Sequence, residues 1–178
     1  MKKEKKEKKN LAILLITIFV LLLLCCSLFI FKKSDNGSGN IINNLTYKVA
    51  LDKDTYKEFS GSVIPTSYII EDTGMNYSIP LKNANEYYQA NLKIVNKGGV
   101  TANLKGIEIT GLTDEQSTYI LHQIKYNDYA FVQSSDKLDF DLKPGESATI
   151  EVFVLATQPV NIDGNFNLGF KLKFEKKK

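Results

Sequence analysis

The sequence has no tryptophan or arginine, one histidine and two cysteines. A serine-protease triad needs a histidine, and the usual zinc sites need several histidines or cysteines. Cys25 and Cys26 both lie inside one apolar run, so no disulfide crosslinks the rest of the chain. His122 stands beside Leu121 and Ile124, and we interpret it as a partly exposed structural histidine. The sequence therefore predicts no catalytic residue, no cofactor and no resident metal.

Clusters of basic residues are also missing from most of the chain. Residues 34–178 hold 15 lysines against 18 acidic residues, which gives a net charge of −3. Domains that bind nucleic acid carry a clustered basic face, so nucleic acid is not an expected partner. No glycine-rich loop opens a helix after a strand, and nucleotide binding therefore has no supporting motif. The positive charge gathers in residues 2–9, where six lysines oppose two glutamates.

The long apolar run of the chain covers residues 11–31 and contains no charged side chain. Its 21 residues would form a helix of roughly 31 Å, which matches the hydrocarbon core of a bilayer. We therefore predict a transmembrane signal anchor at 11–31, preceded by a cytoplasmic lysine-rich tail at 1–10. More lysines precede the run than follow it, and the positive-inside rule then places the C-terminal domain outside the membrane.

Two alternatives exist for this run. A cleavable signal peptide has a shorter apolar core and small residues at its cleavage site, whereas Phe31 is followed by Lys32 and Lys33. A lipidated cysteine would need a small residue before it, but Leu24 precedes Cys25 and further apolar residues follow. The residues favour a retained anchor first, cleavage second and lipidation last.

A flexible linker at 32–44 leads into a domain at 45–178 whose apolar and polar residues alternate. This period of two predicts β-strands with one buried face. The clearest strands are expected at 87–96, 149–156 and 165–175. Gly106 falls where the alternation slips, which predicts a β-bulge. The fold class is therefore all-β: an antiparallel β-sandwich, Ig-like or jelly-roll.

The first half of the domain has a weaker strand pattern. Residues 52–58 are polar and are expected to form a turn or a single helical turn. Pro65 and Pro80 indicate that any strands near them are edge strands or are interrupted, because proline cannot donate a hydrogen bond to a neighbouring strand.

Residues 111–127 are ambiguous between helix and strand. Thr113 and Gln116 have the spacing of a helix capping box. The apolar residues that follow would share one face of a helix, but they also alternate as in a strand. We predict one short helix near 114–125 that lies over the end of the sandwich.

Two sets of residues suggest ligands. Asp136, Asp139 and Asp141 lie close together, and calcium is bound by several oxygen ligands, so a Ca²⁺ site is one hypothesis. Their spacing does not match the EF-hand loop, and we favour a solvated acidic edge that guards against unwanted strand pairing. The nine tyrosines suggest a glycan- or partner-binding patch, although half-buried strand and loop positions explain them more simply.

The later part of the domain resembles a known family. A strand at 92–95 ends in Asn96, Lys97 and Gly98, and the segment LKPGES at 142–147 precedes an apolar strand. This succession, over roughly residues 88–175, is similar to bacterial surface sandwiches that include the TasA/camelysin family of exported matrix-fibre proteins. The resemblance implies a jelly-roll or Ig-like sandwich with a structural, assembling role at the cell surface.

Together, these features favour a membrane-anchored extracytoplasmic domain that is a non-catalytic structural, adhesive or protein-binding module at a bacterial cell surface. The expected partners are the membrane and other surface or matrix proteins, with self-association through strand edges. The alternatives are a matrix-fibre subunit released by signal peptidase and an accessory subunit of a membrane complex. A metal-dependent hydrolase built on the aspartates is the least favoured.

Overall fold

The computed structural model of the chain describes residues 46–160 and 164–177. The tail predicted at 1–10, the anchor at 11–31 and the linker at 32–44 lie outside the described residues. Where the chain is described, no helix has the length and apolar character needed to cross a membrane. The described residues belong to one unit, Asn43–Lys178.

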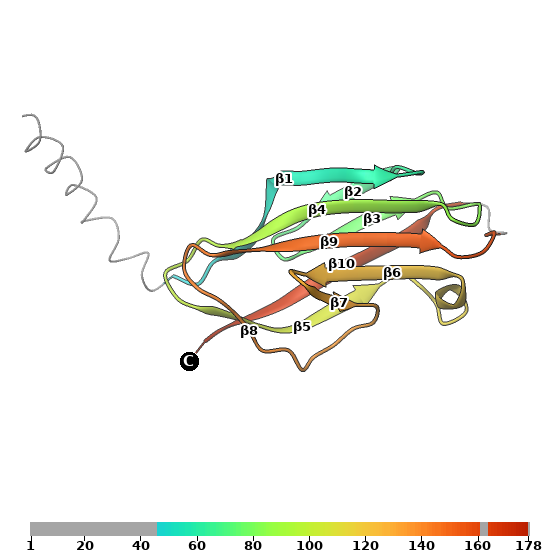
Figure 1. Ribbon diagram of the computed structural model, residues 1–178. Helices are drawn as coiled ribbons and strands as arrows, with labels where there is room; N and C mark the ends of the chain where they lie inside the picture. Colours follow the sequence, from blue (N-terminus) through green and yellow to red (C-terminus); the bar gives the residue numbers. More distant parts are fainter. Residues whose placement is uncertain (1–45, 161–163, 178) are drawn as a thin grey trace, which may run out of the picture. The chain divides into compact units, whose positions relative to one another are not determined.

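The described residues form two five-stranded sheets in which every strand pair is antiparallel (Figure 1). In spatial order, the first sheet contains β1 (Val49–Gly61), β4 (Tyr87–Asn96), β9 (Ser147–Ala156), β6 (Ile120–Tyr126) and β7 (Tyr129–Phe131). The second contains β2 (Ser67–Ile70), β3 (Gly74–Ile79), β10 (Phe166–Lys176), β5 (Ala102–Thr110) and β8 (Phe140–Leu142). The expected all-β class is confirmed, and the arrangement is consistent with a β-sandwich.

One hydrophobic core is shared by the two sheets. Along β9 every second residue is buried, from Ala148 to Ala156, because successive side chains of a strand point to opposite faces. Aromatic contacts join the layers: the rings of Tyr77 in β3 and Tyr88 in β4 have centroids 5.9 Å apart. Tyr126 in β6 likewise meets Phe174 in β10. The apolar strand faces predicted from the sequence thus pack against each other in one core.

The strands expected at 87–96, 149–156 and 165–175 are present within one or two residues as β4, β9 and β10. β9 lies between β4 and β6, and β10 lies between β3 and β5, so both are interior strands of their sheets. The bulge expected at Gly106 is confirmed. Lys173 pairs with Gly106 and Phe174 with Leu104, which leaves Lys105 as the extra residue.

The prediction of a turn at 52–58 is wrong. These residues belong to β1, which pairs with β4 on both sides of an irregular stretch between Asp52 and Lys57. The hydroxyl of Thr55 accepts a hydrogen bond from the backbone N–H of Lys93 (2.8 Å) and donates one to the carbonyl of Asp52 (2.6 Å). A side chain therefore replaces the missing ladder bonds, and the polar composition reflects this bulge rather than a turn.

The prediction of a short helix near 114–125 is also wrong. The capping box exists: the backbone N–H of Thr113 donates to Oε1 of Gln116, and the backbone N–H of Gln116 donates to Oγ1 of Thr113. It closes only a three-residue 3₁₀ turn, η1 (Gln116–Thr118). From Ile120 onward the chain is strand β6, because pairing with β9 and burial of alternate residues outweigh the local helix signal.

The chain enters the first sheet through a short backbone clasp. The carbonyl of Lys48 accepts hydrogen bonds from the N–H groups of Lys97 and Gly98, and the carbonyl of Thr46 accepts one from Gly99. A Cβ at Gly98 would lie 2.2 Å from the carbonyl oxygen of Thr46, so only glycine fits this approach. The turn at 97–99 thus fixes the start of β1 against the end of β4.

Truncating a core residue of β10 should destabilise the domain far more than truncating its neighbour. Leu172 is buried and Lys171 is exposed on the opposite face of the same strand. Leu172→Ala should lower the free energy of unfolding by about 2 to 5 kcal/mol because it leaves a cavity. Lys171→Ala should change it by about 0.5 kcal/mol or less. Urea unfolding of the full chain followed by circular dichroism measures both, and equal effects would contradict the assigned faces.

Candidate functional site

The most unusual surface of the described residues is the segment 60–70, which links β1 to β2 and includes β2 itself. No residue in it carries a charge, although a quarter of the whole chain is charged. Three large apolar side chains on it are exposed: Ile64 (69%), Tyr68 (47%) and Ile69 (66%). We call this segment the β2 edge. Large apolar groups that are exposed together in an uncharged segment are typical of surfaces that contact another molecule.

The geometry of β2 makes it an open strand. It pairs with β3 through four residue pairs, from Ser67 with Ser78 to Ile70 with Met75. It is the outermost strand of the second sheet, and no described strand pairs with its other side. Edge strands in native proteins are usually protected by lysines, prolines or covering loops. Here Pro65 precedes the strand, but the strand itself has no charged protection.

Three tyrosines, Tyr56, Tyr68 and Tyr88, form a cluster at the β2 edge. The ring of Tyr68 packs on the ring of Tyr56 in β1, with centroids 4.7 Å apart. The hydroxyl of Tyr56 lies 2.8 Å from that of Tyr88, and it also donates to Oε1 of Glu58 (3.1 Å). Burial raises the pKa of Tyr88 to about 12, and the pKa of Tyr56 is also raised, chiefly by burial. Tyr56 and Tyr88 therefore stay uncharged at physiological pH.

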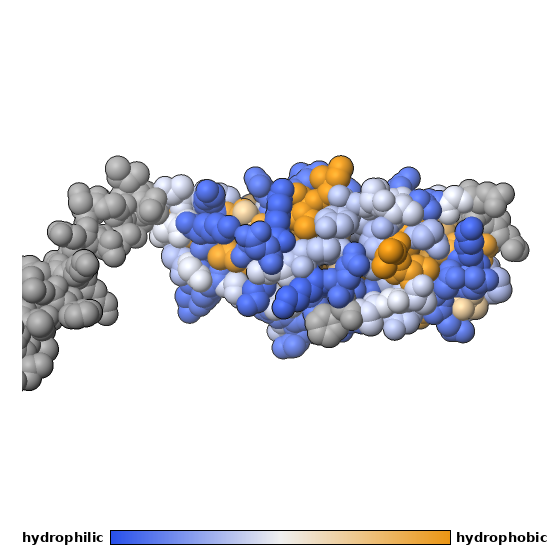
Figure 2. Space-filling view, turned by 90° about the horizontal axis from the view of Figure 1, so that it is seen from above, coloured by the Kyte–Doolittle hydropathy of each residue, from blue (hydrophilic) through white to orange (hydrophobic). Residues whose placement is uncertain are grey.

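Two small hollows flank the β2 edge. One of about 190 Å³ is lined by Ile64, Val63, Tyr88 and residues at the end of β1. The other, of about 170 Å³, lies over β2, β3 and β10. Figure 2, which looks from above onto the side where β1 lies in Figure 1, shows separate hydrophobic patches that interrupt a mainly hydrophilic surface.

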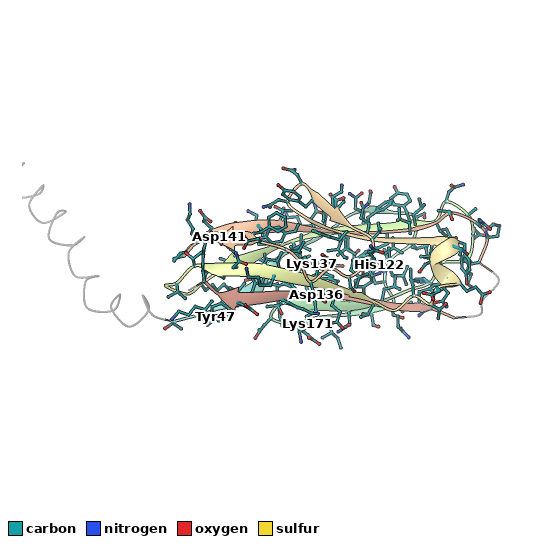
Figure 3. All side chains as sticks on the ribbon, turned by 90° about the horizontal axis from the view of Figure 1, so that it is seen from below. Tyr47, His122, Asp136, Lys137, Asp141 and Lys171 are labelled. Atoms are coloured by element: carbon teal, nitrogen blue, oxygen red, sulfur yellow. The ribbon has the colours of Figure 1, made fainter. Side chains whose placement is uncertain are left out.

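The three aspartates singled out in the sequence do not converge on one point. Asp136 and Asp141 lie at separate places along the molecule (Figure 3). Each carboxylate has its own lysine: Lys173 for Asp136 (2.9 Å), Lys105 for Asp139 (3.1 Å) and Lys177 for Asp141. Among the described residues no group of three or more His, Cys, Asp and Glu could hold a metal ion.

Asp139 and Asp141 are linked instead by an amide. Nδ2 of the buried Asn103 donates to both carboxylates, at 2.8 Å and 2.7 Å. The hydrogen bond from Asn103 and the neighbouring Lys105 lower the pKa of Asp139. The hydrogen bonds from Lys177 and then from Asn103 lower the pKa of Asp141. A paired acidic edge, with each charge satisfied by a cation or an amide, fits this geometry better than a calcium site.

The interpretation of His122 as partly exposed is wrong. Its side chain is only 3% exposed and lies between the two layers (Figure 3). In strand β6, His122 shares a face with Ile120 and Ile124, and that face points into the core. Once β6 is known to be a strand, the alternation of these residues places His122 inside. The mistaken helix prediction had concealed this.

His122 has one polar contact. Its Nε2 meets the hydroxyl of Tyr77, a buried residue of β3 in the opposite sheet. That hydroxyl has no other partner among the described residues, and the tautomer of the ring decides which of the two groups donates. Nδ1 is buried and has no hydrogen-bond partner in the described part of the chain. Burial lowers the pKa of His122 to about 4, so the ring is neutral.

Comparison with known proteins adds no assignment. A scan of the chain against protein-family models finds no match, and a search among curated proteins finds none either.

The burial of His122 should make stability depend on pH. The unfolded chain protonates this residue near its ordinary pKa of 6.5, but the folded chain does so only near 4. Stability is therefore complete above the unfolded pKa and falls with decreasing pH, by about 2 kcal/mol between roughly pH 7.5 and pH 5. Urea unfolding across this range measures the loss, and His122→Gln should remove most of it. An unchanged slope in the variant would show that another group is responsible.

Proposed function

We propose that this chain is a membrane-anchored, extracytoplasmic β-sandwich that serves as a non-catalytic protein-binding module at the bacterial cell surface. Its N-terminal run at 11–31 is the anchor, and residues 32–44 are the spacer. The resemblance to the TasA/camelysin family supports an Ig-like or jelly-roll topology and a structural role. The composition supports a non-catalytic role, because the lone histidine is committed to a core contact with Tyr77.

The observation that carries this proposal is the uncharged β2 edge. Its backbone offers a row of N–H and C=O groups to an extended segment of another protein, and its exposed Ile69 offers an apolar side-chain contact. Addition of a strand to an open sheet edge is a common mode of protein recognition. Main-chain hydrogen bonds supply affinity in this mode, and alternate side chains supply specificity.

The partner's chemistry follows from the charge of the edge. The domain as a whole is acidic, yet residues 60–70 carry no charge. A partner strand that is itself uncharged and apolar on alternate positions would meet no desolvation penalty for buried ions. A second copy of this chain meets that condition, because its own β2 edge is uncharged.

Photo-crosslinking on intact cells tests the edge. Tyr68 on the β2 edge and Tyr129 on β7, the outer strand of the other sheet, have similar exposure (47% and 56%). Tyr68→benzoylphenylalanine in the full chain should give a specific protein adduct, and the matched Tyr129→benzoylphenylalanine should not. The mass of the adduct separates self-association from capture of another protein.

A charge at the edge should abolish that adduct. Ile69→Lys places an ammonium group in the partner's apolar contact, where its burial without a counterion is costly. Adduct yield from Tyr68→benzoylphenylalanine should drop strongly when Ile69→Lys is added. Adding Val132→Lys, at an exposed position beyond β7, should leave the yield unchanged. Equal yields in all three proteins, or no adduct at all, would exclude the β2 edge as the binding surface.

The anchor has its own test. The protein in the membrane fraction should retain residues 1–31, and protease added to intact cells should digest residues 46–177. N-terminal sequencing of the protein from membrane and medium detects the alternative directly. A mature form in the medium that begins near Gly37 would identify a released subunit instead.

A further inference from the structure

The outer face of the second sheet carries a polar hollow of its own. A hollow of about 170 Å³ lies on the outer face of the second sheet and spans four strands. Its side chains come from positions that face outward in register: Ser67 pairs with Ser78, which pairs with Asn167, and Asn76 pairs with Gly169, which pairs with Thr110. Drug-sized ligands occupy pockets of about 300 to 1,000 Å³, so this one suits a single small ring of a longer molecule.

Gly169 pairs with both Asn76 and Thr110, two residues that line the hollow. A Cβ at position 169 would lie 2.4 Å from Oδ1 of Asn76 and 3.2 Å from Oγ1 of Thr110. The absence of a side chain at Gly169 therefore lets these two oxygen atoms approach each other over its backbone.

Two hydrogen bonds at the rim of the hollow orient the side-chain amides of Asn76 and Asn167. Nδ2 of Asn76 donates to Oε1 of Glu71 (3.3 Å), which leaves Oδ1 of Asn76 as the free acceptor. The hydroxyl of Ser78 donates to Oδ1 of Asn167 (2.9 Å), which leaves Nδ2 of Asn167 as the free donor. Within the described residues neither free atom has a protein partner. The hollow thus offers one oriented acceptor, one oriented donor and the hydroxyls of Ser67 and Thr110.

The charge of the lining excludes ionic ligands. The nine residues that line the hollow are Ser, Thr, Asn, Tyr, Leu and Ile, and none is acidic or basic. An anion would find no cation among these nine residues, and the carboxylate at the rim, that of Glu71, accepts a hydrogen bond from Nδ2 of Asn76. A neutral ligand whose groups both donate and accept hydrogen bonds matches this inventory. The exposed Ile69 beside the hollow supplies the apolar contact for the C–H face of such a ring.

We propose that the hollow between β2, β3, β10 and the end of β5 is a subsite for one ring of a neutral carbohydrate. Oδ1 of Asn76 and Oγ1 of Thr110 accept hydrogen bonds from sugar hydroxyls, and Nδ2 of Asn167 donates to one. This site goes beyond the protein-binding edge: the two share Ile69, but the hydrogen-bonding groups of the site lie on β3, β5 and β10 rather than on the open side of β2.

Nuclear magnetic resonance titration of the full chain tests the site, in a detergent that has no sugar headgroup. The probes are the neutral trisaccharides chitotriose, cellotriose and maltotriose, with the anionic trigalacturonate for comparison. At least one neutral probe should shift the amide signals of residues 67–69, 76–78 and 167–169, with a dissociation constant on the order of 1 mM. Trigalacturonate should not shift them.

Matched threonine variants provide the control. Thr110→Val keeps the shape of the side chain and removes its hydroxyl, and it should weaken binding about fivefold. Thr149→Val makes the same change at an exposed position of β9 in the other sheet and should leave binding unchanged. Asn167→Ala should also weaken binding, and its folding is checked by the same spectra. The proposal is overturned if no neutral probe shifts these signals, if trigalacturonate shifts them equally, or if both threonine variants weaken binding alike.

Discussion

The fold depends on one constraint: two strands at the interior of their sheets, β9 and β10, must each turn an apolar face toward the other sheet. Val152 and Val154 in β9 and Leu168 and Leu172 in β10 are almost completely buried. With no disulfide available in the described part of the chain, burial of these side chains is the main source of stability. The outer strands are held because they pair with strands whose positions the core has already fixed.

Polar side chains in such a core need hydrogen-bond partners, and two buried residues, Asn96 and His122, differ in how many they have. Asn96 is fully satisfied: its Nδ2 donates to the carbonyls of Val100 and Leu142, and its Oδ1 accepts from the N–H of Gly98. His122 is satisfied at one nitrogen alone. The first residue locks the turns at one end of the sheets. The second is a weak point of the core, because protonation of the ring would place a buried charge there without a counterion.

The sequence predicted those strands in which burial of one face produces a regular alternation of apolar and polar residues. β4 and β10 alternate cleanly, and the slip at Gly106 identified the bulge. Prediction from the sequence failed where contacts between residues distant in sequence decide the local structure. Thr55 holds the bulge of β1 by bonding Lys93, a partner 38 residues away that no local pattern reveals. The capping box at Thr113 and Gln116 is real, but pairing with β9 overrides the helix after one turn.

The candidate sites were less accessible from sequence than the fold. The absence of charge in residues 60–70 was readable, and Pro65 pointed to an edge strand, but exposure of Ile64 and Ile69 depends on which strands lie beside them. The polar hollow on the second sheet could not be foreseen, because Asn76, Thr110 and Asn167 come from three strands whose register only the folded sheet defines. The sequence suggested a binding patch among the nine tyrosines but favoured half-buried positions, and the packing separates Tyr68 at the surface from Tyr77 in the core.

The clasp between residues 46–48 and 97–99 has a mechanical consequence. The polypeptide on the N-terminal side enters the domain along β1, whose backbone is bonded to β4 over most of its length. A force that draws this entry point away along the strand direction is shared among many hydrogen bonds at once, rather than opening them one after another. Gly98 allows the two backbones to approach closely. The hydrogen bonds between residues 46–48 and 97–99 are therefore the first to carry the load.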